Sequence, residues 1–273
     1  NDAAGPANES GQNLTITGVS SAVGGSVSIV GTNVLFTPTP DYNGPASFTY
    51  TVQDDGTTNG SPDPKSATAN VNFTVTAVND PPVRTSGTLS NLTVAEDAVA
   101  TSLVLGSLAY GPGGGSDEAS QTLTYVVTSV PSLSLGQIVL VDGTTVVSAG
   151  TAYSLSQLQG MKFKPAADAN GGPATFAWKV QDSGGGNDTL NESLQITVTP
   201  VNDPPIPGND TLANIAEDSG TLTIPFATLL ANDAAGPANE SGQNLTITGV
   251  SSAVGGSVSI VGTNVLFTPT PDY

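Results

Sequence analysis

An identical internal repeat is the feature that most constrains what this chain can fold into. The 42 residues Asn1–Tyr42 recur without a change as Asn232–Tyr273, at an offset of 231 positions. Identity over this length is not coincidence, so we interpret the sequence as a tandem array sampled over slightly more than one period. The chain does not begin with Met, and its single Met is Met161, so we expect an internal piece of a longer protein.

Each period contains two related units whose short motifs follow the same order along the chain. The matching segments are Val78–Pro82 and Val201–Pro205 (VNDPP), Ala95–Asp97 and Ala216–Asp218 (AED), Glu9–Val19 and Glu118–Val130, and Phe36–Asp54 and Phe163–Asp182. The motif order predicts one complete domain at 83–203. It is preceded by the back part of a domain at 1–82 and followed by the front part of the next copy at 204–273. We expect neighbouring repeats to complete the two partial domains.

Most segments between turn residues alternate apolar and polar side chains with a period of two, which is typical of half-buried strands. Phe48 and Val52 share one face of such a segment, as Phe176 and Val180 do in its counterpart. The segment 154–159 is the one helical turn that we expect. Many short strands separated by Gly, Pro and Asn turns predict all-β sandwiches of about seven strands each. The Pro-Pro pairs after each VND favour stiff, extended linkers because Pro cannot donate a ladder hydrogen bond.

The charge and the missing residue types restrict the chemistry. The chain has no Cys and no His, which excludes disulfides, thiol chemistry and imidazole catalysis. With 5 Lys and Arg against 23 Asp and Glu, the net charge is −18, and this disfavours nucleic acid as a partner. No apolar run is long enough for a membrane span. Two interpretations of the acidic charge stay open: a solvated surface, or binding sites for hard divalent cations.

Enzymatic alternatives have weaker support, and we predict that the chain is not an enzyme. Pairs of acids suit glycoside hydrolysis, but the same acids recur in both units at structural positions. The glycine-rich stretch Gly111–Gly115 has no following Lys or helix start, so it does not indicate a phosphate loop. Trp178 and Phe176 are aromatic residues that can stack on sugars, but the alternation places them more naturally in the core.

Taken together, the linker VNDPP, the strand-end AED, the acidic loop, the NG turn and the VQD strand end resemble bacterial cadherin-like repeats, the modules of giant repetitive adhesins. Residues 146–171 are also similar to the proteoglycan-type cadherin-like repeat. The resemblance covers nearly the whole chain. It implies tandem cadherin- or immunoglobulin-like Greek-key sandwiches arranged end to end, located outside the cell at the surface or secreted. It also implies calcium held between successive domains.

The resemblance assigns calcium ligands to strand ends, linkers and acidic loops. The implied ligands are Asp2, Glu9, Asp41, Asp54, Asn79, Asp80, Glu96, Asp97, Asp117, Glu118, Asp168, Asp182, Asn202, Asp203, Glu217, Asp218, Asp233 and Glu240. Two positions depart from the family pattern, because Asn43 and Asn170 stand where the Asp-x-Glu motif has its glutamate. We therefore expect fewer or more weakly bound ions at each junction.

A length argument supports the junction sites independently of the resemblance. Asp80 and Glu96 are 16 positions apart, a reach of about 50 Å at roughly 3.3 Å per residue in an extended strand. Glu96 is thus expected beside the linker Asn202-Asp203, with Asp117, Glu118 and Asp182 beside Asn79-Asp80. Converging carboxylates repel, so a cation is their natural compensation. Because Asp and Asn also favour plain turns, the solvated-turn interpretation stays open.

The leading functional prediction is a structural segment of a large adhesin-like surface protein that forms a calcium-stiffened stalk or fibre. Its expected partners are neighbouring repeats of the same chain. Two alternatives come from other classes. The repeats themselves bind glycan or a partner protein, or the chains assemble into an extracellular filament or sheath.

Overall fold

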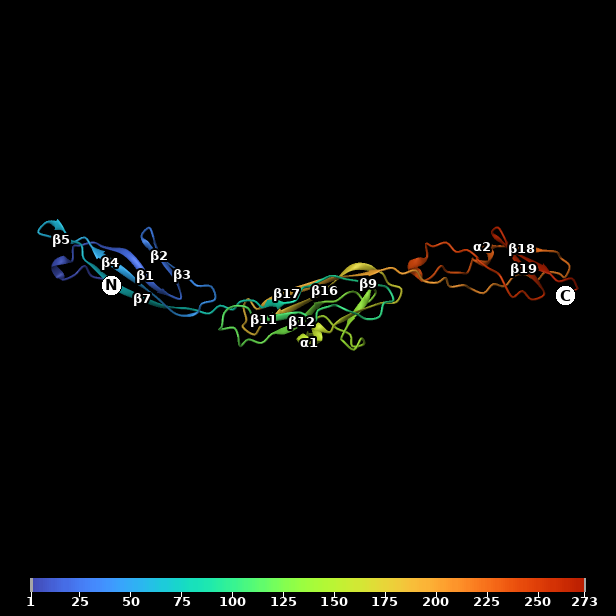
Figure 1. Ribbon diagram of the computed structural model, residues 1–273, viewed down its shortest axis with the longest axis horizontal. Helices are drawn as coiled ribbons and strands as arrows, with labels where there is room; N and C mark the ends of the chain where they lie inside the picture. Colours follow the sequence, from blue (N-terminus) through green and yellow to red (C-terminus); the bar gives the residue numbers. More distant parts are fainter. Residues whose placement is uncertain (1, 273) are drawn as a thin grey trace. The chain divides into compact units, whose positions relative to one another are not determined.

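Short strands make up nearly all regular structure in the computed structural model, which describes residues 2–272 (Figure 1). This confirms the predicted all-β fold class. The chain forms two compact units. One contains the residues up to Ser86 together with Leu108–Tyr125 and Lys179–Asn191, and the other contains Gly87–Ser107, Val126–Trp178 and the residues from Glu192 onward. The predicted domain limits at 82/83 and 203/204 stay predictions.

The N-terminal residues of the first unit form a three-stranded antiparallel sheet and a separate hairpin. Its strands are β1 (Leu14–Val23), β4 (Gly44–Asp54) and β7 (Ser66–Val75), with β4 in the middle, and the hairpin pairs β2 (Gly25–Val30) with β3 (Asn33–Pro38). Short pairs join β5 (Thr57–Thr58) to β6 (Ser61–Pro62) and β8 (Val83–Ser86) to β11 (Ala109–Gly111). The rings of Phe36, Phe48 and Phe73 cluster between the hairpin and the sheet.

Two further sheets are built from the sequence between the two VNDPP linkers. One has the order β10-β15-β13, and the other has the order β14-β12-β16-β17-β9. Their strands are β9 (Leu92–Ala95), β10 (Thr101–Ser102), β12 (Thr124–Ser129), β13 (Gly136–Val139), β14 (Ala152–Tyr153), β15 (Lys162–Pro165), β16 (Gly171–Gln181) and β17 (Thr189–Thr199). All pairings described for these sheets are antiparallel except that of β17 with β9, which is parallel.

Alternating side chains of β16 lie in the core, as the sequence predicts. Phe176, Trp178 and Val180 are fully buried, while in the corresponding strand β4 Ala46 and Phe48 are buried and Val52 is half-buried. The expected helical turn is α1 (Leu155–Gln159), which begins with a capping box formed by Ser154 and Gln157. The longest helix within residues 2–272 is α1, so none of the described helices has the length needed to cross a bilayer.

The last segment of the second unit repeats part of this pattern. A sheet of order β18-β20-β19 is formed by β18 (Leu222–Pro225), β19 (Gly256–Val261) and β20 (Asn264–Pro269), and α2 (Phe226–Leu229) follows β18. The turns η1 (Ala7–Glu9) and η2 (Ala238–Glu240) occupy identical positions in the two copies of the repeat.

Candidate metal centres at the two linkers

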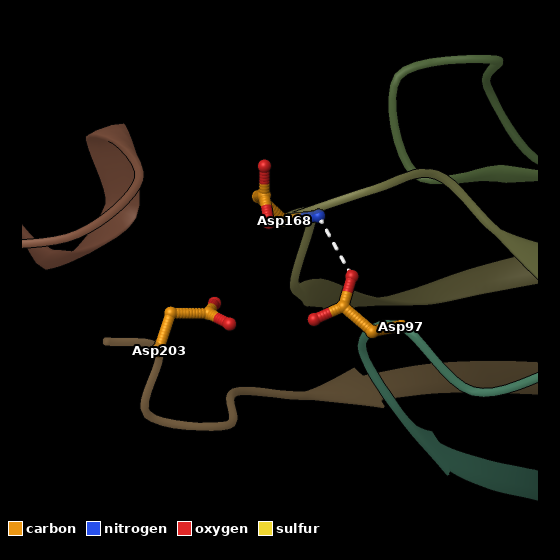
Figure 2. A group of neighbouring side chains, drawn as sticks. All are labelled: Asp97, Asp168 and Asp203. Carbon is orange, nitrogen blue, oxygen red and sulfur yellow. Dashed lines mark hydrogen bonds between the residues drawn. The ribbon is translucent and has the colours of Figure 1, made fainter. Parts of the chain in front are cut away.

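Three aspartates from separate segments gather at the second VNDPP linker (Figure 2). Asp97 follows β9, Asp168 lies in the turn between β15 and β16, and Asp203 lies in the linker after β17. One carboxylate oxygen from each residue lies within 4.8 Å of the other two. We call Asp97, Asp168, Asp203 and the neighbouring Glu240 the second linker cluster. Its oxygens are hard anionic donors of the kind that calcium prefers.

Local backbone geometry explains how Asp97 and Asp168 meet. Both residues have a left-handed φ, 61° for Asp97 and 54° for Asp168, a conformation that Asp tolerates better than most residues with a Cβ. The backbone N–H of Asp168 donates to Oδ1 of Asp97 at 3.2 Å. Parallel pairing places Ala95 opposite Thr199, and Glu96 N–H donates to the Thr199 carbonyl at 2.9 Å. The strand-end AED therefore lies beside the start of the linker.

Glu96 is buried in this junction with both of its carboxylate oxygens hydrogen-bonded. Oε1 accepts from the backbone N–H of Val201 at 2.7 Å, and Oε2 accepts from the amide of Asn170 at 3.0 Å. The Asn239 amide lies 3.1 Å from both oxygens. The hydrogen bond from Asn170, followed by that from Val201, holds the pKa of Glu96 below its ordinary value. Glu96 thus connects the end of β9, the linker and the η2 turn through these hydrogen bonds.

Two acids of the second linker cluster, Asp203 and Glu240, each keep a carboxylate oxygen without a hydrogen bond within residues 2–272. The backbone N–H of Asp203 donates to Oε1 of Glu240 at 2.8 Å. Oδ2 of Asp203 and Oε2 of Glu240 are buried and have no hydrogen-bond partner among the described residues. Burial raises the pKa of Asp203, and the nearby carboxylates of Asp97 and Glu240 raise it further. Orphaned carboxylate oxygens on Asp203 and Glu240, with Asp97 and Asp168 beside Asp203, fit a bound cation.

The first linker repeats the backbone arrangement of the second. Asp80 N–H donates to Oε1 of Glu118 at 2.7 Å, and Oε2 of Glu118 is buried without a partner among residues 2–272. The Gln121 amide donates to Oδ1 of Asn79 at 2.7 Å. The same bond joins Gln243 to Asn202 at 3.0 Å in the second linker. Two sequences that share only their motifs therefore build the same turn.

Several predicted ligands of the first linker are brought together. Asp41, Asp80 and Asp117 line a cavity of about 280 Å³. Asp41 also has a left-handed φ of 57°, like Asp168 in the other junction. Asp182 is buried and accepts from the Asn79 amide at 3.2 Å. We call Asp41, Asp80, Asp117 and Glu118 the first linker cluster.

Other predicted ligands lie outside the two clusters. Asp2 accepts from the Tyr50 hydroxyl at 2.6 Å, and Asp233 accepts from Gly208 N–H at 2.7 Å. Glu9 lines a cavity of about 290 Å³ together with Asp54. Glu217 and Asp218 are exposed after the second linker.

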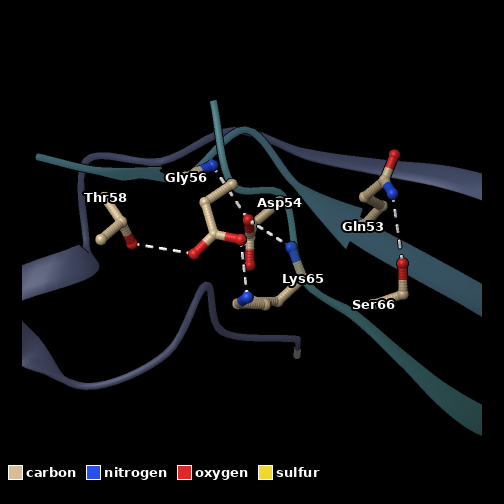
Figure 3. A network of polar contacts seen from close by, with 7 residues as sticks. Gln53, Asp54, Gly56, Thr58, Lys65 and Ser66 are labelled. Carbon is tan, nitrogen blue, oxygen red and sulfur yellow. Dashed lines mark hydrogen bonds and ion pairs between the residues drawn. The ribbon is translucent and has the colours of Figure 1, made fainter. Parts of the chain in front are cut away.

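Asp54 belongs to a polar network at the end of β4 (Figure 3). Its Oδ1 accepts from the backbone N–H groups of Gly56 at 2.9 Å and Lys65 at 3.0 Å. The Lys65 ammonium pairs instead with Asp63 at 2.7 Å. The hydrogen bond from Lys65, followed by that from Thr58, holds the pKa of Asp63 below its ordinary value. Asp54 therefore closes the turn that the VQD motif begins.

Sequence reasoning did not single out three kinds of residue that build these junctions. Asn239 bonds Glu96, and the glutamines Gln121 and Gln243 fix the linker asparagines. A glycine also stands four positions before each turn glutamate, as Gly114 does before Glu118, and a Cβ there would collide with the carboxylate. The signal was present as a recurring G-x-x-x-E-x-x-Q pattern in all three copies.

Comparisons with known proteins agree with the predicted family resemblance. Residues 4–76 match the family model of the cadherin-like domain, and residues 202–273 match that of the bacterial Ig domain. These matches confirm the resemblance to cadherin-like repeats. Such domains are typical of extracellular, adhesion-type repeats and are typically structural rather than enzymatic. No curated protein matches the chain.

Solved structures similar to the chain include three cadherin fragments. Protocadherin gamma B7 extracellular cadherin domains 1–4 is 14% identical with a TM-score of 0.39, and the match covers 96% of this chain and 59% of that one. Mouse cadherin-23 EC22–24 is 13% identical with a TM-score of 0.38, covering 95% and 77%. Human mucin-like protocadherin EC1–2 is 15% identical with a TM-score of 0.31, covering 70% and 85%. The chain thus spans less than two thirds of the first of these.

Proposed function

We propose that the chain is a structural stretch of an extracellular, adhesin-like surface or secreted protein whose repeats are stiffened by calcium at the VNDPP linkers. The observation that carries this proposal is the orphaned, buried carboxylate oxygen of Asp203, which lies in a group with Asp97 and Asp168, together with the orphaned oxygen of Glu240, whose other oxygen accepts from Asp203 N–H. Cadherin-like domains generally bind calcium, which supports the choice of ion. The first linker cluster offers a similar set of donors.

The chain's own residues already hold each linker against the turn that follows it. Asp203 N–H binds Glu240, and Asp80 N–H binds Glu118, so each linker is anchored to the next acidic loop. Glu96 adds a bond to Val201 and another to Asn239. When bound, calcium would supply the positive charge that lets the carboxylates of each cluster stay close together. The linker would then lose its freedom to hinge.

Asn43 and Asn170 stand where the Asp-x-Glu motif of the family has its glutamate, and this difference supports a small number of ions per junction. A glutamate at Asn170 would bring another negative charge, whereas the Asn170 amide donates to Glu96. Glu96 is therefore used as a hydrogen-bond acceptor. The donors left for a cation at the second linker are Asp97, Asp168, Asp203 and Glu240.

Thermal melting and calorimetric titration test this function directly. The chain should melt at a higher temperature in calcium than in chelator, because a ligand that binds only the folded state stabilises it by about 2.7 kcal/mol at a hundred times its Kd. Titration should show binding with a finite stoichiometry. Identical melting curves in calcium and chelator, with no binding heat, would contradict the proposal.

The alternative in which the repeats bind glycan has no observation that favours it. Phe176 and Trp178 are fully buried, so neither ring is free to stack on a sugar. Binding of a partner protein stays a prediction.

A further inference from the structure

The acidic turn after each linker has the same motif residues at both linkers but differs at one charged position. A glycine stands four residues before the turn glutamate and a glutamine three residues after it in both turns. The residue directly before the glutamate is Asp117 at the first linker and Asn239 at the second. A carboxylate thus takes the place of a carboxamide, and only the carboxamide has N–H groups to donate.

The Asn239 amide fastens its turn to the strand-end glutamate that precedes the linker in the chain. Its Nδ2 lies 3.1 Å from each carboxylate oxygen of Glu96. Glu96 is 2% exposed, and it also accepts from the Asn170 amide and the backbone N–H of Val201. These three donors are uncharged. Hydrogen bonds alone therefore satisfy a buried carboxylate at this linker.

The cavities beside the two linkers differ in charge in the same sense. The cavity at the second linker measures about 400 Å³, and its polar lining consists of Asn170, Asn202, Asn239, Gln243 and Glu240. The cavity at the first linker measures about 280 Å³, and its lining includes Asn43 and the carboxylates of Asp41, Asp80 and Asp117. The first cavity therefore holds more negative charge in a smaller volume.

Asp117 cannot form the bonds that Asn239 forms, because an ionised carboxylate only accepts. It also lies close to another acid of the first linker cluster. A Cβ added to Gly115 would lie 3.1 Å from Oδ1 of Asp117 and 3.2 Å from Cβ of Asp41. The next residue, Glu118, has a buried Oε2 without a partner in the described part of the chain. Carboxylates gathered in this way repel one another unless a cation compensates them.

We infer that the residue before the turn glutamate decides how strongly each linker depends on a cation. Asn239 is a positioning residue that holds the second linker in place through Glu96 when no cation is bound. Asp117 leaves the first linker to be held by a cation. The role of Asp117 rests on the proposed function, because it requires calcium at the first linker, whereas the role of Asn239 does not. The two linkers then differ in stiffness whenever calcium is scarce.

Hydrogen exchange of the whole chain, followed by mass spectrometry, tests Asn239 in chelator. The peptide that contains Val201 should be protected in the parent, because Val201 N–H donates to Glu96. Asn239→Asp places a second carboxylate against Glu96. This peptide should then exchange about tenfold faster or more, as expected when a hydrogen bond to a charged group is lost. Asn239 is exposed, so the core strand β16 should keep the exchange rate of the parent.

Two further variants separate the pairing of Asn239 with Glu96 from a general effect of charge. Asn8→Asp makes the same substitution at the same position of η1, where Asn8 is also exposed, so the Val201 peptide should exchange as in the parent. Glu96→Gln combined with Asn239→Asp interchanges the carboxylate and the carboxamide, so most of the protection should return. Parent exchange in Asn239→Asp, equal acceleration by Asn8→Asp, or no recovery in the double variant would overturn the inference.

A variant without added charge covers the case in which Asn239→Asp also accelerates exchange of β16. Asn239→Ala removes the amide alone, so it should accelerate exchange of the Val201 peptide and leave β16 unchanged. Acceleration of both segments by Asn239→Ala, or of neither, would overturn the role of Asn239.

Asp117→Asn is the reciprocal test at the first linker. In the parent, calcium should slow exchange of the peptide that contains Asp80, whose N–H donates to Glu118. Asp117→Asn removes one carboxylate from the cavity, so it should gain less protection from calcium, and a response equal to that of the parent would overturn the role of Asp117. If calcium protects neither linker while Asn239→Asp still accelerates exchange in chelator, the proposed function fails and the role of Asn239 stands.

Discussion

At the residue scale, the surroundings of Glu96 and of Asp203 at the second linker shift the pKa values of these two carboxylates in opposite directions. Glu96 accepts hydrogen bonds on both oxygens, and these lower its pKa. Asp203 keeps one orphaned oxygen among like charges, and burial and those charges raise its pKa. Glu96 therefore contributes stability above its ordinary pKa, and this is lost as the pH falls through its lowered value. For Asp203 the sign is reversed, and its contribution is lost as the pH rises through its raised value.

The effect of Asp203→Asn on the melting temperature should consequently change sign when calcium is added. In chelator at neutral pH the variant should melt at a higher temperature than the parent, because an uncompensated buried charge is removed. This difference should shrink as the pH falls and Asp203 of the parent is protonated. In calcium the variant should melt at a lower temperature, because it has lost a ligand. Melting curves across the acid range in both conditions check the reversal, and a variant that is less stable in both would contradict it.

Asp97→Asn and Asp218→Asn change the same residue of the AED motif in two environments. Asp97 lies in the second linker cluster, whereas Asp218 is exposed. We expect Asp97→Asn to weaken calcium binding by about tenfold or more, equivalent to about 1.4 kcal/mol, and Asp218→Asn to leave it nearly unchanged. Calorimetric titration of the two variants measures the difference. Equal effects would remove Asp97 from the site.

At the element scale, the core around α1 and the buried strands resembles that of an ordinary sandwich. Leu158 of α1 is 1% exposed, and Phe163 of β15 and Phe176 of β16 are fully buried. The N-terminal sheet and hairpin are more open, since Val23 of β1 and Leu35 of β3 are each 52% exposed. Packing therefore differs along a chain whose motifs are repeated.

Leu158→Ala and Leu133→Ala form a matched pair for this difference. Leu158 is buried, and its truncation should lower the free energy of unfolding by about 2–5 kcal/mol because it leaves a cavity. Leu133 is 75% exposed, and its truncation should stay within about 0.5 kcal/mol of the parent. Denaturant unfolding of both variants gives the two values. A similar loss for Leu133→Ala would mean that its surface is covered in solution.

At the scale of the whole molecule, the net charge of −18 opposes the compact state through self-repulsion. Monovalent salt screens this repulsion without occupying a specific site. Screening by monovalent salt and binding of calcium should both raise the melting temperature. The concentration at which each salt acts therefore separates the two effects.

In chelator, monovalent salt should raise the melting temperature gradually over the concentration range in which the Debye length shortens to about 10 Å or less. Calcium should raise it at far lower concentrations and reach a plateau. Melting curves against each salt test this. If calcium acts only at the ionic strength at which monovalent salt acts, the acidic residues form a solvated surface and not a site.

The sequence alone determined the elements whose partners are near in the chain. Alternation and turn residues predicted strands, the Ser154–Gln157 capping box lies within the one expected helical turn, and the hairpin β2–β3 forms identically as β19–β20. Local contacts decide these features, so the same residues give the same result wherever they occur. The spacing of 16 positions between Asp80 and Glu96 also predicted Glu96 beside the second linker, where it accepts from Val201 N–H.

Only the tertiary structure decided the features that need a distant partner. Residues 14–23 form a strand because β4 lies beside them, and the identical residues 245–254 do not. Asn239, which lies 143 positions from Glu96, is placed against it by the fold of the linker. The orphaned oxygens of Asp203 and Glu240 follow from burial, which no local pattern specifies. These features depend on distant partners because a strand is stable only when another strand or a sheet completes its hydrogen bonds and covers its apolar face.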